Sequence, residues 1–369
     1  MTEPLSRTSA LASRHTALGS GLEDWNGMGT AWEYDTDPCD EHDAIREAAG
    51  MFDMSPLKKI QVRGTDAGSA VDHLHSRDLA RLGPGQSAYG AVLTDSGKVA
   101  DDAIAFNNGD DGWLVVHGSG SSMELLAESA EGRDIQLALD DDLHIVSLQG
   151  PESLPLLDAH ASADLSSLAY FHHLSTELFG RPVMVSRTGY SGERGYEIFA
   201  TAHDVGAVWD GILAAGEVDG VMAASFTALD KVRVEAALLF YGYDMTDDHF
   251  PSEVGLGWAL SRSGADYRGR QAALAAAGTE RFVFAGISID HTDMVAGGET
   301  LRLEGRDVGT VNSPAWSHRM GKSLALVHLA PDAADAGTAL EVVGEDASYR
   351  ATVERIPFYD SEKSRTHAP

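Results

Sequence analysis

The chain has 369 residues, 43% of them hydrophobic, which is enough to bury a large core and predicts two or three domains. Its net charge of −30 argues against binding to nucleic acid or to anionic membranes, and no apolar run is long enough to span a membrane. The single cysteine, Cys39, excludes an intrachain disulfide and a cysteine-based metal cluster, and residues 1–14 lack a signal-peptide core, so a cytoplasmic location is expected.

Helices and strands follow one another in mixed order in the first part of the chain. The predicted elements are a helix at 40–51, a strand at 52–62, a helix at 66–82, two strands within 88–106, a strand at 113–116 and a helix at 121–131. Asp40 can cap the first helix, and Gly50 can end it. This order is typical of an α+β arrangement rather than of an alternating, doubly wound sheet.

A related pattern begins at Leu143 and is followed by a different one. The first predicts a strand up to Ser147, a helix after Pro151, strands near Val183 and at 196–200, a helix at 205–215 and one long helix at 223–240. Six short alternating runs follow, separated by turns rich in glycine and aspartate, at 284–289, 301–303, 308–311, 324–328, 340–343 and 349–353. Such runs predict a small antiparallel β-barrel or sandwich.

Common cofactor-binding motifs are absent from the sequence. No G-x-G-x-x-G follows a strand, and there is neither a Walker loop nor an H-E-x-x-H segment. His172 and His173 are neighbours on a predicted strand and should point apart, so no metal site is expected. The acidic surface is interpreted as strongly hydrated, with attraction of a cationic substrate as the alternative.

Seven segments, in order and spread over nearly the whole chain, resemble the glycine cleavage T-protein family, which also includes folate-dependent demethylases. They lie at 40–55, 89–102, 149–151, 187–198, 230–242, 251–258 and 313–325. The most distinctive is the run RTGYSGERGYEI at 187–198. The resemblance implies an α+β fold shaped as a three-lobed cloverleaf, with two ferredoxin-like lobes and a C-terminal antiparallel β-barrel around a central folate channel.

The same resemblance predicts the domain boundaries and the cofactor. Residues 1–53 together with 142–260 would form the folate-binding lobe, 54–141 the second ferredoxin-like lobe, and 280–369 the barrel. Tetrahydrofolate is the expected cofactor. The chain would then be an enzyme that transfers a one-carbon group.

Two carboxylates are the predicted centre of the site. A buried carboxylate can accept two N–H groups from the edge of a reduced pterin, and Glu197 is the candidate for this role. A second carboxylate near the reactive folate nitrogens can orient their lone pairs and balance the developing charge. By resemblance this catalytic residue is Asp101; Asp102 alternates to the opposite side of the strand, so one of the two should face the pocket.

Other side chains are predicted to line the channel or to support it. Tyr89 and Tyr190 resemble the tyrosines that line the folate channel, with ordinary aromatic packing as the alternative. Arg233 could bind the folate glutamate tail or form an internal ion pair. Trp258 is expected in the core, His42 is expected to be structural, and the loop at 316–319 could cap the channel or form a plain turn.

The chain departs from the family pattern at the predicted donor end of the channel. Leu229 stands where the pattern commonly has arginine, and His117 stands where it usually has asparagine. These two residues and Tyr34 are therefore the predicted contacts to the one-carbon donor. A changed donor with retained folate chemistry favours demethylation of a small N-, S- or O-methylated molecule, giving 5-methyltetrahydrofolate.

Two alternatives stay open from the sequence. A T-protein proper would act on an aminomethyl-lipoyl carrier protein and release ammonia and 5,10-methylenetetrahydrofolate. A non-enzymatic folate-binding protein of iron–sulfur assembly would carry a Lys-Gly-Cys segment, which this chain lacks.

Overall fold

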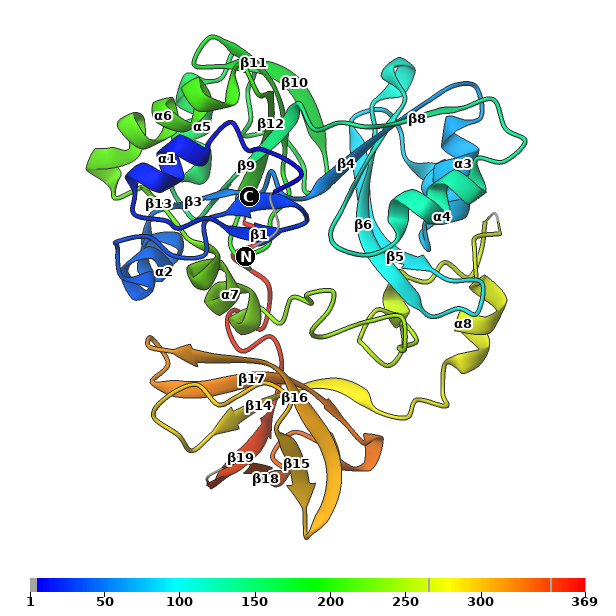
Figure 1. Ribbon diagram of the computed structural model, residues 1–369, viewed down its shortest axis with the longest axis vertical. Coiled ribbons are helices and arrows are strands. Elements are labelled where there is room, and N and C mark those ends of the chain that lie inside the picture. The colour runs from blue at the N-terminus through cyan, green and yellow to red at the C-terminus, as the bar shows by residue number, and fades with distance from the viewer. Residues whose placement is uncertain (1–4, 265, 346, 369) are drawn as a thin grey trace.

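The predicted strand at 52–62 is divided into two strands that belong to different sheets. In the computed structural model, which describes residues 5–264, 266–345 and 347–368, β3 (Gly50–Asp53) ends before a turn and β4 (Lys58–Arg63) begins after it. β3 pairs with β9 (Leu143–Gln149), whereas β4 pairs with β7 (Trp113–His117). The prediction of one continuous strand is therefore wrong, because the chain passes here from the first lobe to the second (Figure 1).

The first lobe, at the upper left of Figure 1, is built on a six-stranded sheet in the order β10-β11-β12-β9-β3-β13. The strands not yet given are β10 (His173–Leu178), β11 (Arg181–Ser186), β12 (Gly195–Thr201) and β13 (Met222–Ala223). The helices of this lobe are α1 (Ala12–Ala17), α2 (Pro38–Glu47), α5 (Ser153–His160) and α6 (Val205–Gly216). Trp209 and Ile212 of α6 are buried against Leu148 and Ile198 of the sheet, and this apolar contact holds the layers together.

The second lobe, at the upper right of Figure 1, has a five-stranded sheet in the order β5-β6-β7-β4-β8. Its other strands are β5 (Gln86–Leu93), β6 (Val99–Asn107) and β8 (Gln136–Leu139), and its helices are α3 (Ala67–Leu74) and α4 (Ser122–Ser129). α3 ends well before the predicted 82, because His75 takes an extended conformation and bridges to Val92 of β5. Val71 and Leu74 of α3 are buried together with Val115 of β7 in one hydrophobic core.

The third lobe is a closed antiparallel barrel in the order β14-β17-β16-β15-β18-β19. Its strands are β14 (Val283–Ile289), β15 (Thr300–Leu303), β16 (Arg306–Ser317), β17 (Lys322–Leu329), β18 (Ala339–Val343) and β19 (Ser348–Glu354). All six predicted runs are strands, and closure of the sheet decides between the barrel and the sandwich. Alternate residues such as Ile287, Leu301 and Val342 point inward and fill the barrel.

The predicted long helix at 223–240 is wrong at both ends. β13 occupies its start, and α7 (Phe226–Glu235) is capped by Ser225, whose side chain accepts a hydrogen bond from the Ala228 amide. The helix stops at Ala236, and Ala237 has a left-handed φ of 54° that no helix can continue through. Neither a glycine nor a proline marks this end in the sequence, so the helical periodicity predicted a helix that is too long. The first helix also starts earlier than predicted, with Asp37 rather than Asp40 as its cap.

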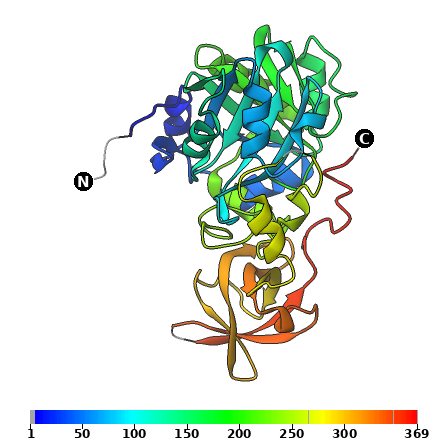
Figure 2. The same ribbon diagram turned by 90° about the vertical axis from the view of Figure 1, so that its right-hand side faces the viewer.

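Shorter elements complete the chain. They are the hairpin strands β1 (Glu23–Trp25) and β2 (Met28–Thr30), helix α8 (Arg270–Ala276), and the 3-10 turns η1 (Leu79–Arg81), η2 (Gly109–Asp111), η3 (Glu217–Asp219), η4 (Gly257–Ala259) and η5 (Pro331–Ala333). After β19 the chain leaves the barrel and returns to the first lobe (Figure 2). There Arg365 pairs with Glu193 at 2.9 Å, which anchors this C-terminal segment.

The predicted fold class is confirmed: an α+β protein with two ferredoxin-like lobes and a C-terminal antiparallel barrel. The described residues contain no helix that is long and apolar enough to cross a membrane.

Candidate active site

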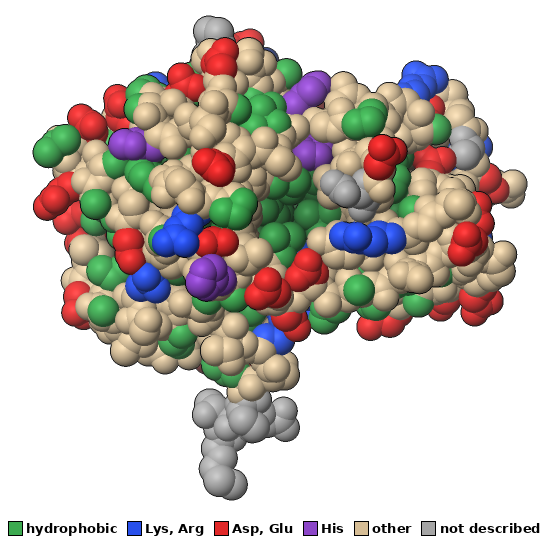
Figure 3. Space-filling view, turned by 90° about the horizontal axis from the view of Figure 1, so that it is seen from above, with side chains coloured by type: hydrophobic (Ala, Val, Ile, Leu, Met, Phe, Trp, Pro, Cys, Tyr) green, Lys and Arg blue, Asp and Glu red, His purple; other side chains and the backbone are tan. Residues whose placement is uncertain are grey.

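A cavity of about 650 Å³ lies where the lobes meet. Its walls come from both upper lobes, from the irregular segment after α7, and from the C-terminal segment. Seen from above, the surface is hollowed between the two upper lobes, and hydrophobic side chains lie inside the hollow (Figure 3). Of the predicted site residues, five line this cavity: Tyr89, His117, Tyr190, Glu197 and Leu229. Asp101, Arg233 and Tyr34 are not among its lining residues.

Glu197 lies on β12, a strand in the middle of the first sheet, and is only 8% exposed. The Thr188 hydroxyl donates a hydrogen bond to its carboxylate. Burial raises the pKa of Glu197, and the bond from Thr188 opposes that rise. Gly195 supports this placement, because a Cβ there would collide with the Gln149 side chain on β9 at 2.2 Å. A buried acceptor with one fixed donor therefore faces the cavity.

Asp102, and not Asp101, is the carboxylate of β6 on the cavity wall. Strand alternation separates the two neighbours, as expected, but the packing of the second lobe turns Asp101 away from the cavity. Asp101 is fully buried and accepts hydrogen bonds from the Ser122 hydroxyl at 2.6 Å and from the Asp102 amide at 2.9 Å. The expectation that Asp101 is the member of the pair that faces the pocket is corrected, because Asp102 is the one that lines the cavity.

The hydroxyl of Tyr89 donates to Asp102 at 2.9 Å. Burial, and next the charge of Asp101, raises the pKa of Asp102 to about 7. Burial, and next the charge of Asp102, raises the pKa of Tyr89 well above its usual range, so Tyr89 stays protonated as the donor. Near neutral pH, Asp102 can thus exist with or without its proton.

Aromatic rings form a flat wall beside this pair. Tyr89 stacks with Trp258, with ring centroids 6.3 Å apart and an interplanar angle of 28°. The Arg77 guanidinium lies 5.3 Å from the Trp258 ring. Trp258 is 62% exposed, so its expected place in the core is wrong, because η4 presents the ring to the cavity mouth. Tyr190 lines the cavity as well, and its hydroxyl donates to the Leu239 carbonyl.

The cavity has an apolar region around Leu229 of α7. Trp25 of β1 and Phe226 of α7 meet edge to face there, with centroids 5.0 Å apart, and Met54 lies in the same wall. His117, the last residue of β7, lines the cavity and places Nδ1 2.8 Å from Asp101 Oδ2.

Arg233 and Tyr34 belong to buried networks outside the cavity lining. Arg233 pairs with Asp244 at 2.7 Å and donates to the Ser313 hydroxyl at 2.8 Å, which ties α7 to the barrel. Of its two predicted roles, the internal ion pair is the one observed. The Tyr34 hydroxyl lies 2.9 Å from His15 Nδ1 within the first lobe, so its predicted place beside the donor is corrected.

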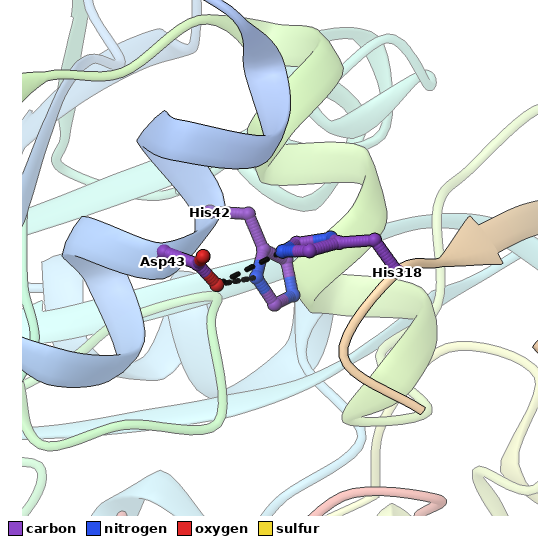
Figure 4. A group of neighbouring side chains, drawn as sticks. All are labelled: His42, Asp43 and His318. Atoms are coloured by element: carbon purple, nitrogen blue, oxygen red, sulfur yellow. Dashed lines mark hydrogen bonds and ion pairs between the residues drawn. The ribbon is translucent and has the colours of Figure 1, made fainter. Parts of the chain in front are cut away.

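A group of side chains joins α2 to the turn after β16 (Figure 4). His42, Asp43 and His318 place possible metal-ligand atoms within 4.8 Å of one another. Asp43 Oδ1 already accepts from His318 Nε2 and from the Arg319 guanidinium, each at 2.9 Å. The Arg319 charge neutralises this carboxylate, so the group acts as an electrostatic clamp between lobes. The loop at 316–319 is a structural turn and does not line the cavity.

Sequence reasoning missed several cavity residues. Arg77 and Phe226 carried no recognisable signal, since each reaches the cavity only through packing between lobes. The C-terminal segment was missed for the same reason: its cavity residues are Pro357, Tyr359, Asp360, Lys363, Thr366 and His367.

Residues 11–263 match the GCVT N-terminal domain, and residues 283–360 match the glycine cleavage T-protein C-terminal barrel domain. The chain belongs to the glycine cleavage T-protein family. The resemblance inferred from the sequence motifs is confirmed, and with it the prediction of a one-carbon transferase at the level of the family.

Two relatives with different names illustrate what the chain is similar to. The chain is 44% identical to the "Heme-dependent oxidative N-demethylase gamma subunit" of Ectopseudomonas mendocina over 98% of both chains. It is 34% identical to the "Aminomethyltransferase" of Shouchella clausii, over 88% of this chain and 90% of that one. Among solved structures, aminomethyltransferase T of Bartonella henselae superposes with a TM-score of 0.88 over 96% of this chain and 98% of that one. At 23% identity, this last match bears on the fold alone.

Proposed function

We propose that this chain binds tetrahydrofolate in the central cavity and loads onto it a one-carbon unit at the oxidation level of formaldehyde, released by N-demethylation of a small amine. The product is 5,10-methylenetetrahydrofolate. The observation that carries the proposal is the presence of two carboxylates, Glu197 and Asp102, on the wall of one cavity although they come from different lobes.

The cavity has the size and the polar groups for a reduced folate. A volume of about 650 Å³ lies within the usual range for pockets of such ligands. Glu197 offers a buried acceptor for the N–H groups of the pterin edge, and the pterin and aminobenzoyl rings find flat partners in Tyr89, Tyr190 and Trp258. The exposed Lys363 at the cavity wall suits the glutamate tail.

Asp102 is the group proposed to act beside the reacting nitrogens. When bound, tetrahydrofolate supplies two nucleophilic nitrogens that hold the one-carbon unit between them. As a carboxylate, Asp102 accepts a hydrogen bond from such a nitrogen and balances positive charge as it develops. Tyr89 holds the Asp102 carboxylate in place through its hydrogen bond of 2.9 Å.

The donor is proposed from the relative at 44% identity, whose name places it in an oxidative N-demethylase as a subunit. A partner that oxidises an N-methyl group would release formaldehyde, and this chain would capture it. Leu229 supports this choice over an aminomethyl-lipoyl carrier, because the wall lacks the arginine of the T-protein pattern.

Direct methyl transfer to give 5-methyltetrahydrofolate is the second candidate. The observation that favours it is the aromatic wall of Trp25, Phe226 and Phe240. The ring centroid of Trp25 lies 5.0 Å from that of Phe226 and 5.9 Å from that of Phe240. Aromatic faces of this kind attract cationic methyl groups, as in a quaternary ammonium or sulfonium donor.

Product analysis separates the candidates. The purified full chain is mixed with tetrahydrofolate and either formaldehyde or a betaine, and the folate products are separated by chromatography. The proposal expects binding of tetrahydrofolate by calorimetry, and formation of 5,10-methylenetetrahydrofolate from formaldehyde faster than the uncatalysed reaction. Appearance of 5-methyltetrahydrofolate from the betaine would favour the second candidate, and absence of folate binding would end both.

A further inference from the structure

We propose that His42, Asp43 and His318 form a binding site for one divalent transition-metal ion, such as Zn²⁺, at the junction between the first lobe and the barrel. His42 and Asp43 come from α2, and His318 follows β16, so an ion held by the three would join the two lobes (Figure 4). The three are not among the residues that line the central cavity, and the site is independent of the proposed folate chemistry.

His42 presents a buried ring nitrogen that the protein does not use. Its Nε2 lies 2.9 Å from Oε2 of the Glu235 carboxylate, which accepts its proton in a hydrogen bond. The same oxygen accepts from the Arg46 guanidinium at 2.8 Å, which balances the charge of Glu235, so the imidazole is neutral with its proton on Nε2. Nδ1 therefore carries a lone pair. His42 is fully buried, and its Nδ1 has no hydrogen-bond partner in the described part of the chain.

This lone pair lies close to a carboxylate. Nδ1 of His42 is 3.7 Å from Asp43 Oδ1, which is too far for a hydrogen bond. Two acceptor atoms at this distance repel each other unless a cation lies between them. A histidine that binds a metal usually donates its other N–H to a carboxylate, which fixes the ring and makes the free nitrogen more basic. Glu235 holds this position behind His42.

His318 supplies a third ligand atom to the same place. Its Nε2 lies 2.9 Å from Asp43 Oδ1, and its Nδ1 has no hydrogen-bond partner among the described residues, so the ring proton can move to Nδ1 and leave Nε2 as a ligand. Ligand atoms on a tetrahedral zinc ion stand roughly 3.4 Å apart. The separations of 2.9 and 3.7 Å from Asp43 Oδ1 lie on either side of this value, and the partly exposed His318 ring can rotate to complete the geometry.

Two imidazole nitrogens and one carboxylate oxygen select the class of ion. Zn²⁺ and Co²⁺ bind such mixed nitrogen and oxygen ligands, whereas Mg²⁺ and Ca²⁺ prefer oxygen ligands. Three protein ligands leave a fourth position for water. Asp43, with 42% of its side chain exposed, gives the ion a path from solvent.

Arg319 competes with the ion for the carboxylate. Its guanidinium donates to Asp43 Oδ1 at 2.9 Å and to Glu47 Oε1 at 2.8 Å. A metal ion at Asp43 would displace the first of these bonds, and the guanidinium would keep the second. Because the two cations repel each other, removal of the Arg319 charge should strengthen metal binding. Opposite effects of substitutions at the adjacent positions 318 and 319 are therefore the signature of a metal ion at this place.

The test uses the full chain, purified without a histidine tag and freed of metal with a chelator, and the variants His318→Asn, Arg319→Gln and His203→Asn. His203 is exposed and lies outside the cluster, which makes it the matched control for His318. Zn²⁺ is titrated by calorimetry near neutral pH, and Co²⁺ is added as a probe whose visible spectrum reports its ligands. Thermal unfolding of each protein without metal shows that it is folded, and unfolding with Zn²⁺ measures the stabilisation by the ion.

The wild type and H203N should bind one Zn²⁺ per chain, H318N should bind it at least about 100-fold more weakly, and R319Q about tenfold more tightly. Zn²⁺ should raise the unfolding temperature of the wild type but not that of H318N. Absence of saturable binding in the wild type, or equal affinity in the wild type and H318N, would overturn the site. Binding to R319Q that is no tighter than to the wild type would overturn it as well.

Discussion

Tyr89 and Asp102 meet diagonally across the strands β5 and β6. Tyr89 is paired in register with Ile104, two residues from Asp102, so both side chains stand on the same face of the sheet and join in a hydrogen bond of 2.9 Å. That face is the cavity wall, whereas the alternate residue Asp101 faces the opposite side, toward Ser122 of α4. The strand β6 thus places two adjacent carboxylates on opposite faces of the sheet.

The raised pKa of Asp102 has a consequence for stability. Its folded pKa of about 7 exceeds the unfolded value near 4, so the folded chain binds the proton more tightly and loses stability as pH rises from about 4 to 7. We expect Asp102→Asn to stabilise the protein by about 1–2 kcal/mol at pH 8 and by little at pH 4, since cavity water screens part of the charge. Thermal unfolding at both pH values measures this; equal effects at the two values would contradict it.

The protonation state of Asp102 should also determine the rate of the proposed reaction. Because the carboxylate form of Asp102 is the proposed acceptor, the rate of one-carbon capture should fall as pH drops below about 7. Asp102→Asn should lower the rate by about 100-fold at pH 8 and flatten its dependence on pH in this range. A rate–pH profile of the wild type and the variant decides the point, and a variant that keeps the wild-type profile would assign the titration to another group.

Glu197→Gln tests the pterin contact. The amide replaces one acceptor oxygen with a donor, so two N–H groups can no longer be bound, and affinity for tetrahydrofolate should fall at least about tenfold. Glu177→Gln is the matched control, because Glu177 is exposed on β10 of the same sheet. Calorimetric titration of both variants gives the comparison. Equal affinities would remove Glu197 from the site.

Trp258→Ala separates binding from folding. The ring is 62% exposed, so the variant should change the free energy of unfolding by no more than about 0.5 kcal/mol. Loss of its stacking with Tyr89 should weaken tetrahydrofolate binding by about 1 kcal/mol, or roughly fivefold. Unfolding by denaturant and calorimetric titration measure the two effects. Strong destabilisation with unchanged binding would return Trp258 to a structural role.

The buried carboxylate of Glu235 on α7 should make the stability of the protein sensitive to acid. His42, Arg46 and the Ser317 hydroxyl surround this buried carboxylate and hold its pKa near 2, against the opposing effect of burial. A depressed pKa gives stability that is present above about pH 4.5 and is lost as pH falls toward 2. Glu235→Gln should therefore destabilise the protein by about 3 kcal/mol at pH 7 and by less at pH 3.

Glu47 supplies the control for this prediction. It pairs with Arg319 at 2.8 Å in the same region but is 66% exposed at its side chain. Glu47→Gln should therefore cost less than about 1 kcal/mol at either pH. Similar losses of stability in the two variants would contradict the view that burial makes the contribution of Glu235 larger than that of an exposed ion pair.

Predictions of secondary structure from the local residue pattern succeeded where the pattern within one element is sufficient to identify it. Alternation of apolar residues identified all six barrel strands, because each strand has one face toward the barrel interior. The same reasoning failed at the end of α7, where Ala237 adopts a left-handed conformation without a glycine or proline to announce it. It also failed at 52–62, where a turn sends two halves of one alternating run into different lobes.

The amino-acid sequence by itself determined the family, the order of the lobes and the position of Glu197 on a strand. Only the tertiary structure decided which of two adjacent aspartates faces the cavity, and it placed Trp258 at the cavity mouth and the C-terminal segment in the cavity wall. The physical reason is that alternation tells which residues share a face, whereas the side of the sheet that meets another lobe depends on contacts between residues far apart in the chain. His117 and Asp101 became a pair in the same way, through the register of β7 beside β6.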